Sequence, residues 1–163
     1  MTPAARFEDI WRQHSADVFR FAYYLSGDRT VAEDLTSETF LRAWSTEDRL
    51  RLETVKGYLL AIARNLFLES KRRDWRRQPL DTAGDVRSQP SGVESRIELE
   101  HVRLALQQLP EHDRMAILLR AEEALPYEEI ARILTIPVAT VKVKVHRGRL
   151  RLAEITGRNW SRV

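Results

Sequence analysis

Apolar residues recur at steps of three and four positions along the first half of the chain, the spacing that places them on one face of an α-helix. The first stripe predicts a long helix ending near Gly27, and its members are Phe7, Ile10, Trp11, Val18, Phe21, Ala22 and Leu25. Glycine suits the residue after a helix, because it adopts left-handed backbone angles cheaply. Residues 30–33 have the spacing of a capping box and predict a second helix over residues 31–45. A third helix begins near Thr54, with a stripe of Val55, Tyr58, Leu59, Ile62 and Leu66.

The helical pattern stops after residue 77 and resumes beyond residue 93. Residues 78–95 contain two Pro, two Gly, three Ser and two Asp with little apolar content, which is typical of a linker. Helical spacing then returns, and Pro110 suits the first position of another helix because a proline lacks only an N–H that is unused there. The sequence therefore predicts an all-α protein of two small helical domains, residues 1–77 and 94–163, joined by a flexible linker over residues 78–93.

Residues 127–152 have the pattern of a helix-turn-helix. A short helix over residues 127–134 would turn Ile130, Ala131 and Leu134 inward, and residues 135–137 predict a tight turn. A second helix over residues 138–153 would bury Val138, Val141, Val145 and Leu152. Val and Lys alternate over residues 141–145, which also fits a β-strand. The wider spacing and the proline at position 137 favour the helix. The second domain is accordingly predicted to be a helix-turn-helix domain.

Basic residues are concentrated in two blocks, although the 163-residue chain has a formal net charge of only +3. Residues 132–158 hold seven Lys or Arg against one acid, a local charge of +6, and residues 64–77 hold six against two, a local charge of +4. Two such blocks indicate two surfaces that meet a polyanion, while a charged run is equally compatible with a solvated helix face.

Other features of the composition exclude several classes of site. The chain has no cysteine, which excludes disulfides and thiolate metal sites. It has no apolar run near the roughly 20 residues that cross a membrane, and residues 1–12 lack the apolar core of a signal peptide. We expect a cytoplasmic protein with no membrane insertion, no cofactor and no metal.

The second helix of the predicted helix-turn-helix offers a surface for reading DNA, since the first turns of that helix enter the major groove in such motifs. Its buried stripe leaves an outer face of Lys142, Val143, His146, Arg147 and Arg149. Arg and Lys donate to guanine acceptors, and a valine packs on a thymine methyl group. Lys144 and Arg151 lie toward the flanks, where contacts to phosphate are expected. The alternative is an amphipathic core helix with a wet basic face.

Two segments of the first half are AEDLTSETFLRAW at residues 32–44 and KGYLLAIARNL at residues 56–66. They resemble the core-polymerase-binding segment and the promoter-melting helix of one known family, the extracytoplasmic-function (ECF) sigma factors of bacterial RNA polymerase. In the second half, LPE, YEEIA and IPVATVK are similar to their C-terminal domain and stand at residues 109–111, 127–131 and 136–142. The match runs over residues 7–153 in the family's order.

The resemblance implies a sigma factor that binds core RNA polymerase, recognises −35 and −10 promoter elements and promotes melting of the DNA. Contacts to the polymerase are expected from an exposed acidic and apolar set, Asp34, Glu38, Phe40, Leu41 and Trp44. Leu41 and Trp44 are equally compatible with a place in the core. Contacts to the −35 element are expected from Thr140, Lys142, Val143, Lys144, His146, Arg147, Arg149 and Arg151.

The same resemblance assigns the −10 element to the third helix. Asn65 would hold a flipped base, because a side-chain amide can read the Watson–Crick edge of an extruded base, and residues 45–53 would form the pocket wall. The DNA backbone would follow Arg72, Arg73 and Arg76. Asn65 also fits an ordinary surface position. An anti-sigma factor is a further expected partner, and Asp81 and Asp85 of the linker are expected to enter a basic channel of the polymerase.

Two positions depart from the family pattern. Thr135 stands where the turn usually has glycine, so either this threonine is strained or the turn differs. Pro126 stands where a capping Ser or Thr is common, although proline can also open a helix.

Three other classes of protein fit the sequence less well than a sigma factor. An enzyme would need a convergent catalytic or metal-binding set, whereas His14, His101, His112 and His146 fall on separate predicted helices and no Gly-rich phosphate loop is present. A sigma mimic that sequesters an anti-sigma factor would not need the basic recognition face. A stand-alone helix-turn-helix regulator would not account for the first 77 residues.

Overall fold

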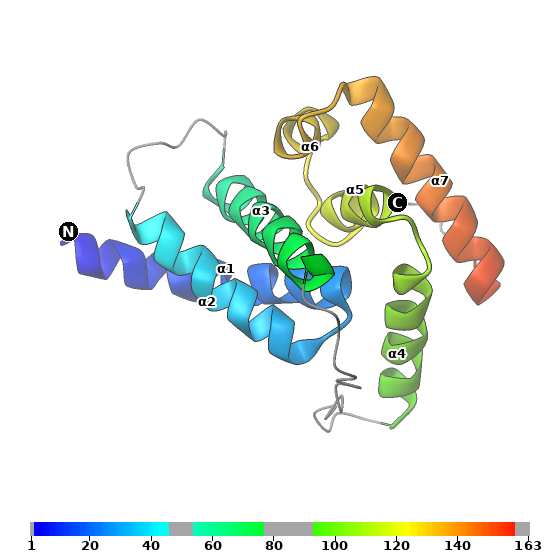
Figure 1. The fold of residues 1–163 in the computed structure, drawn as a ribbon, viewed down its shortest axis with the longest axis horizontal. Coiled ribbons are helices and arrows are strands. Elements are labelled where there is room, and N and C mark those ends of the chain that lie inside the picture. Colours follow the sequence, from blue (N-terminus) through cyan, green and yellow to red (C-terminus); the bar gives the residue numbers. More distant parts are fainter. Residues whose placement is uncertain (1, 46–53, 77–92, 159–163) are drawn as a thin grey trace.

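The computed structural model describes residues 2–45, 54–76 and 93–158, and all regular structure within these ranges is helical (Figure 1). The helices are α1 (Pro3–Ser26), α2 (Arg29–Ser45), α3 (Val55–Arg76), α4 (Val93–Gln107), α5 (Glu111–Ala121), α6 (Tyr127–Leu134) and α7 (Val138–Thr156). The predicted all-α fold is confirmed, and residues 141–145 are helical rather than a strand.

Local signals set the ends of α1 and α2. Thr2 caps the start of α1 by accepting a hydrogen bond from the backbone N–H of Ala5, and Gly27 ends the helix with a left-handed φ of 71°. The predicted capping box at residues 30–33 is wrong. The cap of α2 is Asp28, whose carboxylate accepts from the N–H of Thr30 at 2.8 Å and that of Val31 at 3.2 Å. An aspartate placed before the helix satisfies two free amides at once, so Thr30 lies inside the helix.

The first three helices bury one face each against their neighbours. The inner face of α1 is the end of the predicted stripe, Val18, Phe21, Ala22 and Leu25. The inner face of α3 differs from the prediction, because the fully buried residues are Leu59, Leu60, Ala63, Leu66 and Phe67. Helix α3 packs against α1, α2 and α6, so it buries a wider and rotated face that leaves Tyr58 and Ile62 only half-buried.

Helix α5 lies at the centre of the second half, in contact with α1, α6 and α7 (Figure 1). Residues 113–119 of this helix are all buried, which suits an element covered on several sides. Pro110 precedes α5 as its N-cap, one position earlier than predicted, and its carbonyl accepts from the N–H of Arg114.

The two groups of helices pack against each other. Helix α1 contacts α4 and α5, and α3 contacts α6. The buried apolar side chains therefore form one cluster that continues from α1–α3 into α4–α7. Residues 78–92 of the predicted linker lie outside the described residues, and residue 93 is the first of α4.

Candidate nucleic-acid interface

Helices α6 and α7 form the predicted helix-turn-helix. Ile130 of α6 and Val141 and Val145 of α7 are completely buried and hold the two helices together. Thr135 ends α6 in the left-handed region, with φ 58° and ψ 45°, and the N–H of Ile136 bonds back to the carbonyl of Ala131. A β-branched residue at positive φ is strained, so the first of the two readings of Thr135 is confirmed. Pro126 precedes α6 in an extended conformation, as a proline before a helix should.

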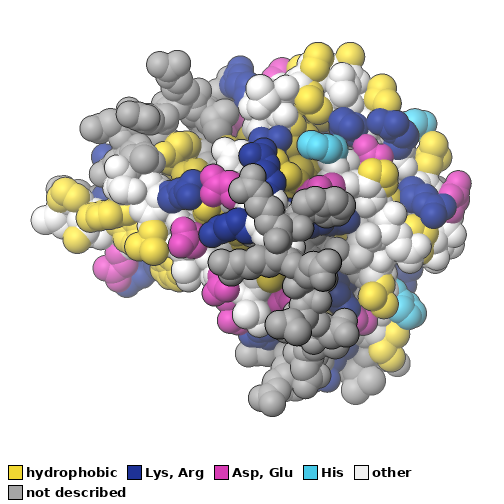
Figure 2. Space-filling model, viewed as in Figure 1, with side chains coloured by type: hydrophobic (Ala, Val, Ile, Leu, Met, Phe, Trp, Pro, Cys, Tyr) yellow, Lys and Arg dark blue, Asp and Glu magenta, His cyan; other side chains and the backbone are white. Residues whose placement is uncertain are grey.

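The outer face of α7 is basic and well exposed at its first turns. Lys142, Val143, His146 and Arg147 are exposed, and Lys and Arg side chains gather over this helix at the upper right of Figure 2. Val143 is 53% exposed, so the helix carries there an apolar side chain that its own core does not use.

Two basic residues of α7 form ion pairs with a buried acid of α5. The Nζ of Lys144 and an Nη of Arg147 each lie 3.7 Å from the carboxylate of Asp113. Lys144 is largely covered there, whereas Arg147 keeps more than half of its side chain exposed. Lys144 is thus tied to its own domain, and Arg147 is oriented by Asp113 while it remains accessible. Of the other predicted −35 residues, Arg151 is exposed, and Thr140 and Arg149 are half-buried.

Helix α3 presents Asn65 to solvent. Its amide oxygen accepts a 2.9 Å hydrogen bond from the guanidinium of Arg64, which orients the amide. Arg72 and Arg73 are exposed two turns further along the same helix. Arg76 is the last residue of α3, and its side chain lies outside the described residues, as do residues 46–53 of the predicted pocket wall (residues 45–53) and the linker acids Asp81 and Asp85.

Helix α2 exposes most of the predicted polymerase-binding set. Asp34 and Glu38 are exposed one turn apart, Leu41 is 64% exposed and Trp44 is 44% exposed, so the alternative that Leu41 and Trp44 belong to the core is wrong. Phe40 contradicts the prediction, since it is only 2% exposed. Its ring packs edge-on against Trp11, with centroids 4.6 Å apart, in the contact between α1 and α2. Phe40 therefore belongs to the buried contact between α1 and α2 and not to the exposed set.

The described residues contain no group of three His, Asp or Glu that could hold a metal ion. The four histidines lie apart, on α1, α4, α5 and α7. No helix within the described ranges is long and apolar enough to cross a membrane.

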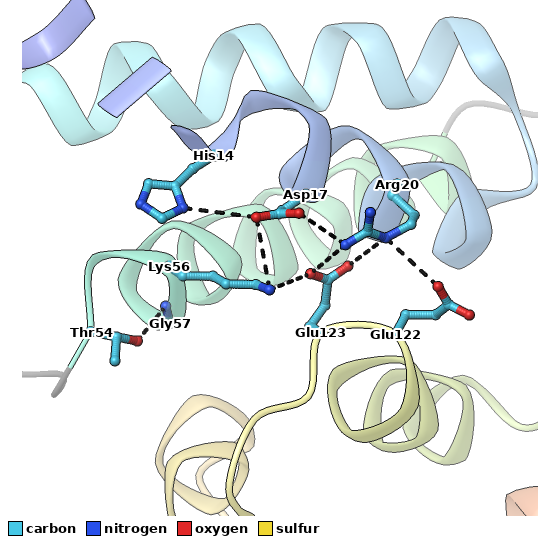
Figure 3. A network of polar contacts seen from close by, with 8 residues as sticks. All are labelled: His14, Asp17, Arg20, Thr54, Lys56, Gly57, Glu122 and Glu123. Carbon is cyan, nitrogen blue, oxygen red and sulfur yellow. Dashed lines mark hydrogen bonds and ion pairs between the residues drawn. The ribbon is translucent and has the colours of Figure 1, made fainter. Parts of the chain in front are cut away.

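Sequence reasoning missed a polar network that joins the two groups of helices (Figure 3). Glu123, in the turn after α5, has a fully buried side chain, and its carboxylate lies 3.0 Å from the Nζ of Lys56 and 3.1 Å from an Nη of Arg20. Glu129 of α6 is also buried and accepts a 2.6 Å hydrogen bond from the hydroxyl of Thr54. The partners are separated by 67 residues or more, so no local pattern predicts these contacts; the signal in the sequence is a glutamate beside the buried stripe of α6.

Two models of known protein families match this chain, one over each group of helices. The family model described as Sigma-70 region 2 matches residues 10–77, and the one described as Sigma-70, region 4 matches residues 99–152. The ECF RNA polymerase sigma factor EcfG of Rhodopseudomonas palustris is 36% identical over 140 residues, which cover 83% of this chain and 76% of EcfG. The chain belongs to the ECF sigma factors of RNA polymerase. The predicted family is thereby confirmed.

Further relatives include a longer sigma factor and two solved structures with the same fold. The ECF sigma factor SigE of Mycolicibacterium smegmatis is 35% identical over 95% of this chain, and the match spans 63% of SigE. Among solved structures, the sigma factor RpoE of Bartonella quintana, crystallised with the anti-sigma factor NepR, is similar with a TM-score of 0.80 and 26% identity. That match covers 93% of this sigma factor and 97% of RpoE, so it extends over both groups of helices. CnrH, solved with the cytosolic domain of CnrY, shares the fold with a TM-score of 0.69 at 22% identity.

Proposed function

We propose that this sigma factor binds core RNA polymerase with the exposed face of α2, reads the −10 element with α3 and reads the −35 element with α7. The observation that carries the proposal is the exposed outer face of α7, where an apolar side chain stands among cations on the second helix of a helix-turn-helix. That combination suits base edges in a major groove, which need both donors and an apolar contact.

The −35 residues divide by their accessibility. Lys142, Val143, His146 and Arg147 are exposed on the first turns and are assigned to base edges. Thr140, Arg149 and Arg151 are assigned to the DNA backbone, where contacts supply affinity and register. Lys144 also attracts the DNA backbone through its positive charge. Because it is paired with Asp113, we assign it no contact with a base.

The assignments to the −10 element and to the polymerase also depend on which side chains are exposed. The amide of Asn65 is exposed and held by Arg64, as a group that reads a flipped base should be. Arg72, Arg73 and Arg76 would follow the single strand electrostatically. On α2, Leu41 and Trp44 form an exposed apolar pair rimmed by Asp34 and Glu38, a composition that suits a protein interface. Residues 1–77 and 94–163 would then act as separate domains in the polymerase.

Regulation by an anti-sigma factor is part of the proposal. RpoE of Bartonella quintana, which is similar over both groups of helices, was solved in complex with such a factor.

We also expect a cytoplasmic protein that works by binding, with no catalytic group of its own. A sigma mimic or a stand-alone regulator is disfavoured, because the basic face of α7 and the exposed face of α2 occur in one chain.

Run-off transcription on genomic fragments tests this function. Core RNA polymerase supplemented with the full chain should start transcripts at discrete positions, whereas core enzyme alone should not. A matched chain carrying Arg147→Ala together with Lys142→Ala should lose these starts but still bind core enzyme. Binding of core enzyme with no transcript from any fragment would instead identify a sigma mimic, and binding of DNA without core enzyme would identify a stand-alone regulator.

A further inference from the structure

Two cations of the first group of helices converge on one buried carboxylate of the second. Arg20 projects from α1 and Lys56 from the first turn of α3, and both contact Glu123 (Figure 3). The side chain of Glu123 is completely buried, while Arg20 and Lys56 remain about one-third and one-quarter exposed. The cations thus line a shallow surface of α1–α3, and the carboxylate is inserted into it from outside.

The surroundings of this site leave it positive once Glu123 is removed. Asp17 lies 2.9 Å from Arg20 and 3.8 Å from Lys56, His14 lies 3.9 Å from Asp17, and Glu122 lies 3.7 Å from Arg20. On the α1–α3 side, two cations therefore face one carboxylate. Burial by itself would lower the pKa of Arg20, but its bonds and charge interactions with Glu123 and then Asp17 raise it overall. Without Glu123, two cations against one carboxylate leave a net positive site that an anion can occupy.

A second carboxylate approaches the same turn of α3. Glu129 accepts from the hydroxyl of Thr54, and that hydroxyl in turn accepts a 3.0 Å hydrogen bond from the N–H of Gly57. A Cβ at Gly57 would collide with the Glu129 carboxylate, so glycine allows the acid to come this close. Two acids of the second group thus meet the first turn of α3. Residue 53, the end of the predicted −10 pocket wall, directly precedes this turn.

We propose that Arg20 and Lys56 form a binding site for a backbone phosphate of the melted −10 strand, and that Glu123 occupies this site in the arrangement described here. The proposal rests on the proposed function, since it adds a phosphate site to α3, the helix that carries Asn65. A carboxylate held by an arginine and a lysine uses the geometry that these side chains offer to a phosphate. Glu123 therefore acts as a phosphate substitute contributed by the second group.

Distances make the two occupants mutually exclusive. The −35 and −10 elements lie about 25 base pairs apart by their numbering, which is roughly 85 Å of duplex at 3.4 Å per base pair. A compact chain of this length has a radius of gyration of about 15 Å and spans only about 40 Å. A sigma factor that reads both elements must separate α1–α3 from α4–α7. This separation withdraws Glu123 and exposes Arg20 and Lys56 where the DNA strand passes.

The test uses the full chain and a fluorescein-labelled dT12 single strand, because a phosphate site needs no promoter sequence. Binding is followed by anisotropy over a series of KCl concentrations for the wild type, Lys56→Gln, Glu123→Gln, Glu123→Gln/Lys56→Gln and Glu123→Gln/Arg12→Gln. Arg12 is a matched control, since it lies on α1 two turns before Arg20, is exposed and pairs only locally with Glu8. Circular dichroism verifies that each variant is folded.

We expect Glu123→Gln to bind dT12 about tenfold more tightly than the wild type, since the competing carboxylate is gone. Adding Lys56→Gln should reverse this gain and lower the slope of log K against log salt by about 0.7, the value for one phosphate of a single strand. Adding Arg12→Gln should leave the slope unchanged. The two partners of one ion pair then move DNA binding in opposite directions.

Other outcomes would overturn the proposal. If Lys56→Gln tightened binding as Glu123→Gln does, the ion pair would only hold the two groups together. An unchanged affinity of Glu123→Gln would show that this carboxylate does not compete with DNA. Binding of inorganic phosphate at equal phosphate concentration, in competition with dT12, would assign the site to a free anion. These results are independent of run-off transcription, so failure of the proposed function remains distinguishable.

Discussion

Arg114 of α5 donates a 2.7 Å hydrogen bond from its guanidinium to the backbone carbonyl of Leu25 in the last turn of α1. The same side chain also donates to the carbonyls of Leu106 and Leu109, so one buried cation joins the two groups of helices. Gln107 and Arg103 reach the carbonyls of Tyr24 and Gly27 in the same turn. The C-terminal end of α1, where unpaired carbonyls concentrate negative charge, is therefore capped by side chains of the second group.

Replacing Arg114 by Met should destabilise the folded chain by roughly 3 kcal/mol, because three buried carbonyls lose their donor. Burial already lowers the pKa of Arg114, so this charge depends in the interior on its hydrogen bonds and on the negative charge of Glu111. Thermal or urea unfolding measures the loss. As a control, Arg158→Met breaks an exposed pair with Glu98 and should cost no more than about 1 kcal/mol. Equal effects of the two substitutions would contradict the capping role.

Relief of backbone strain at Thr135 should stabilise the helix-turn-helix. Thr135→Gly keeps the left-handed turn without a Cβ and should raise the free energy of unfolding by about 1 kcal/mol. Thr135→Ala, which keeps a Cβ at the same φ, should gain less. Unfolding curves of the three chains, recorded side by side, give the order directly. A loss of stability with glycine would mean that the threonine side chain contributes contacts that outweigh the strain.

Substitutions at two adjacent residues of α2 should affect polymerase binding and folding stability separately. Leu41→Ala should weaken capture of core RNA polymerase by the full chain with little change in its melting temperature, because Leu41 is mostly exposed. Phe40→Ala should instead cost about 3–5 kcal/mol of stability, since it empties a buried aromatic contact. If Leu41→Ala melted early and still captured core enzyme normally, the exposed face of α2 would not be the interface.

Asn65→Ala tests the reading of a flipped base. Binding of core polymerase should stay intact, because Asn65 is an exposed residue of α3 and does not belong to the predicted polymerase-binding set on α2, while open-complex formation on a double-stranded promoter should fall. A template whose −10 region is already melted should restore only part of the loss, since the base contact itself is missing. Permanganate footprinting reports the melted bases. A footprint identical to that of the wild type would reject the role.

Arg147 and Lys144 should separate sequence reading from charge. Arg147→Ala should cost about 1–3 kcal/mol on the cognate −35 element and relax the preference at one base position. Lys144→Ala should weaken all sequences alike, because its charge acts on phosphates and not on a base edge, and should lower the salt slope by less than the roughly 0.9 of a full phosphate contact, because Asp113 already pairs with it. Holoenzyme is titrated against single-base variants of the −35 element at several salt concentrations. If both substitutions lowered the affinity for every sequence equally, α7 would contact only the phosphates of the DNA.

Much of the fold was predictable because it depends on short-range spacing. The steps of three and four in the apolar pattern place the buried faces of α1, α6 and α7, and Gly27 ends α1 as expected. The exposed face of α7 follows from the same arithmetic, since residues that are not on the buried stripe must point outward. Local spacing failed where a helix has several neighbours, as on α3, and where a single acid before the helix, Asp28, caps better than the expected box.

Tertiary structure alone decided which side chains meet. Phe40 lies in the same turn as Leu41, yet only the packing of α1 on α2 buries one and leaves the other exposed. The contacts of Glu123 with Arg20 and Lys56 and of Arg114 with Leu25 join residues 67 to 103 positions apart. Such contacts depend on how two helical groups dock, and the free energy of docking is spread over many side chains. The sequence by itself therefore determined the helices and the family, whereas their docking determined which charges are covered.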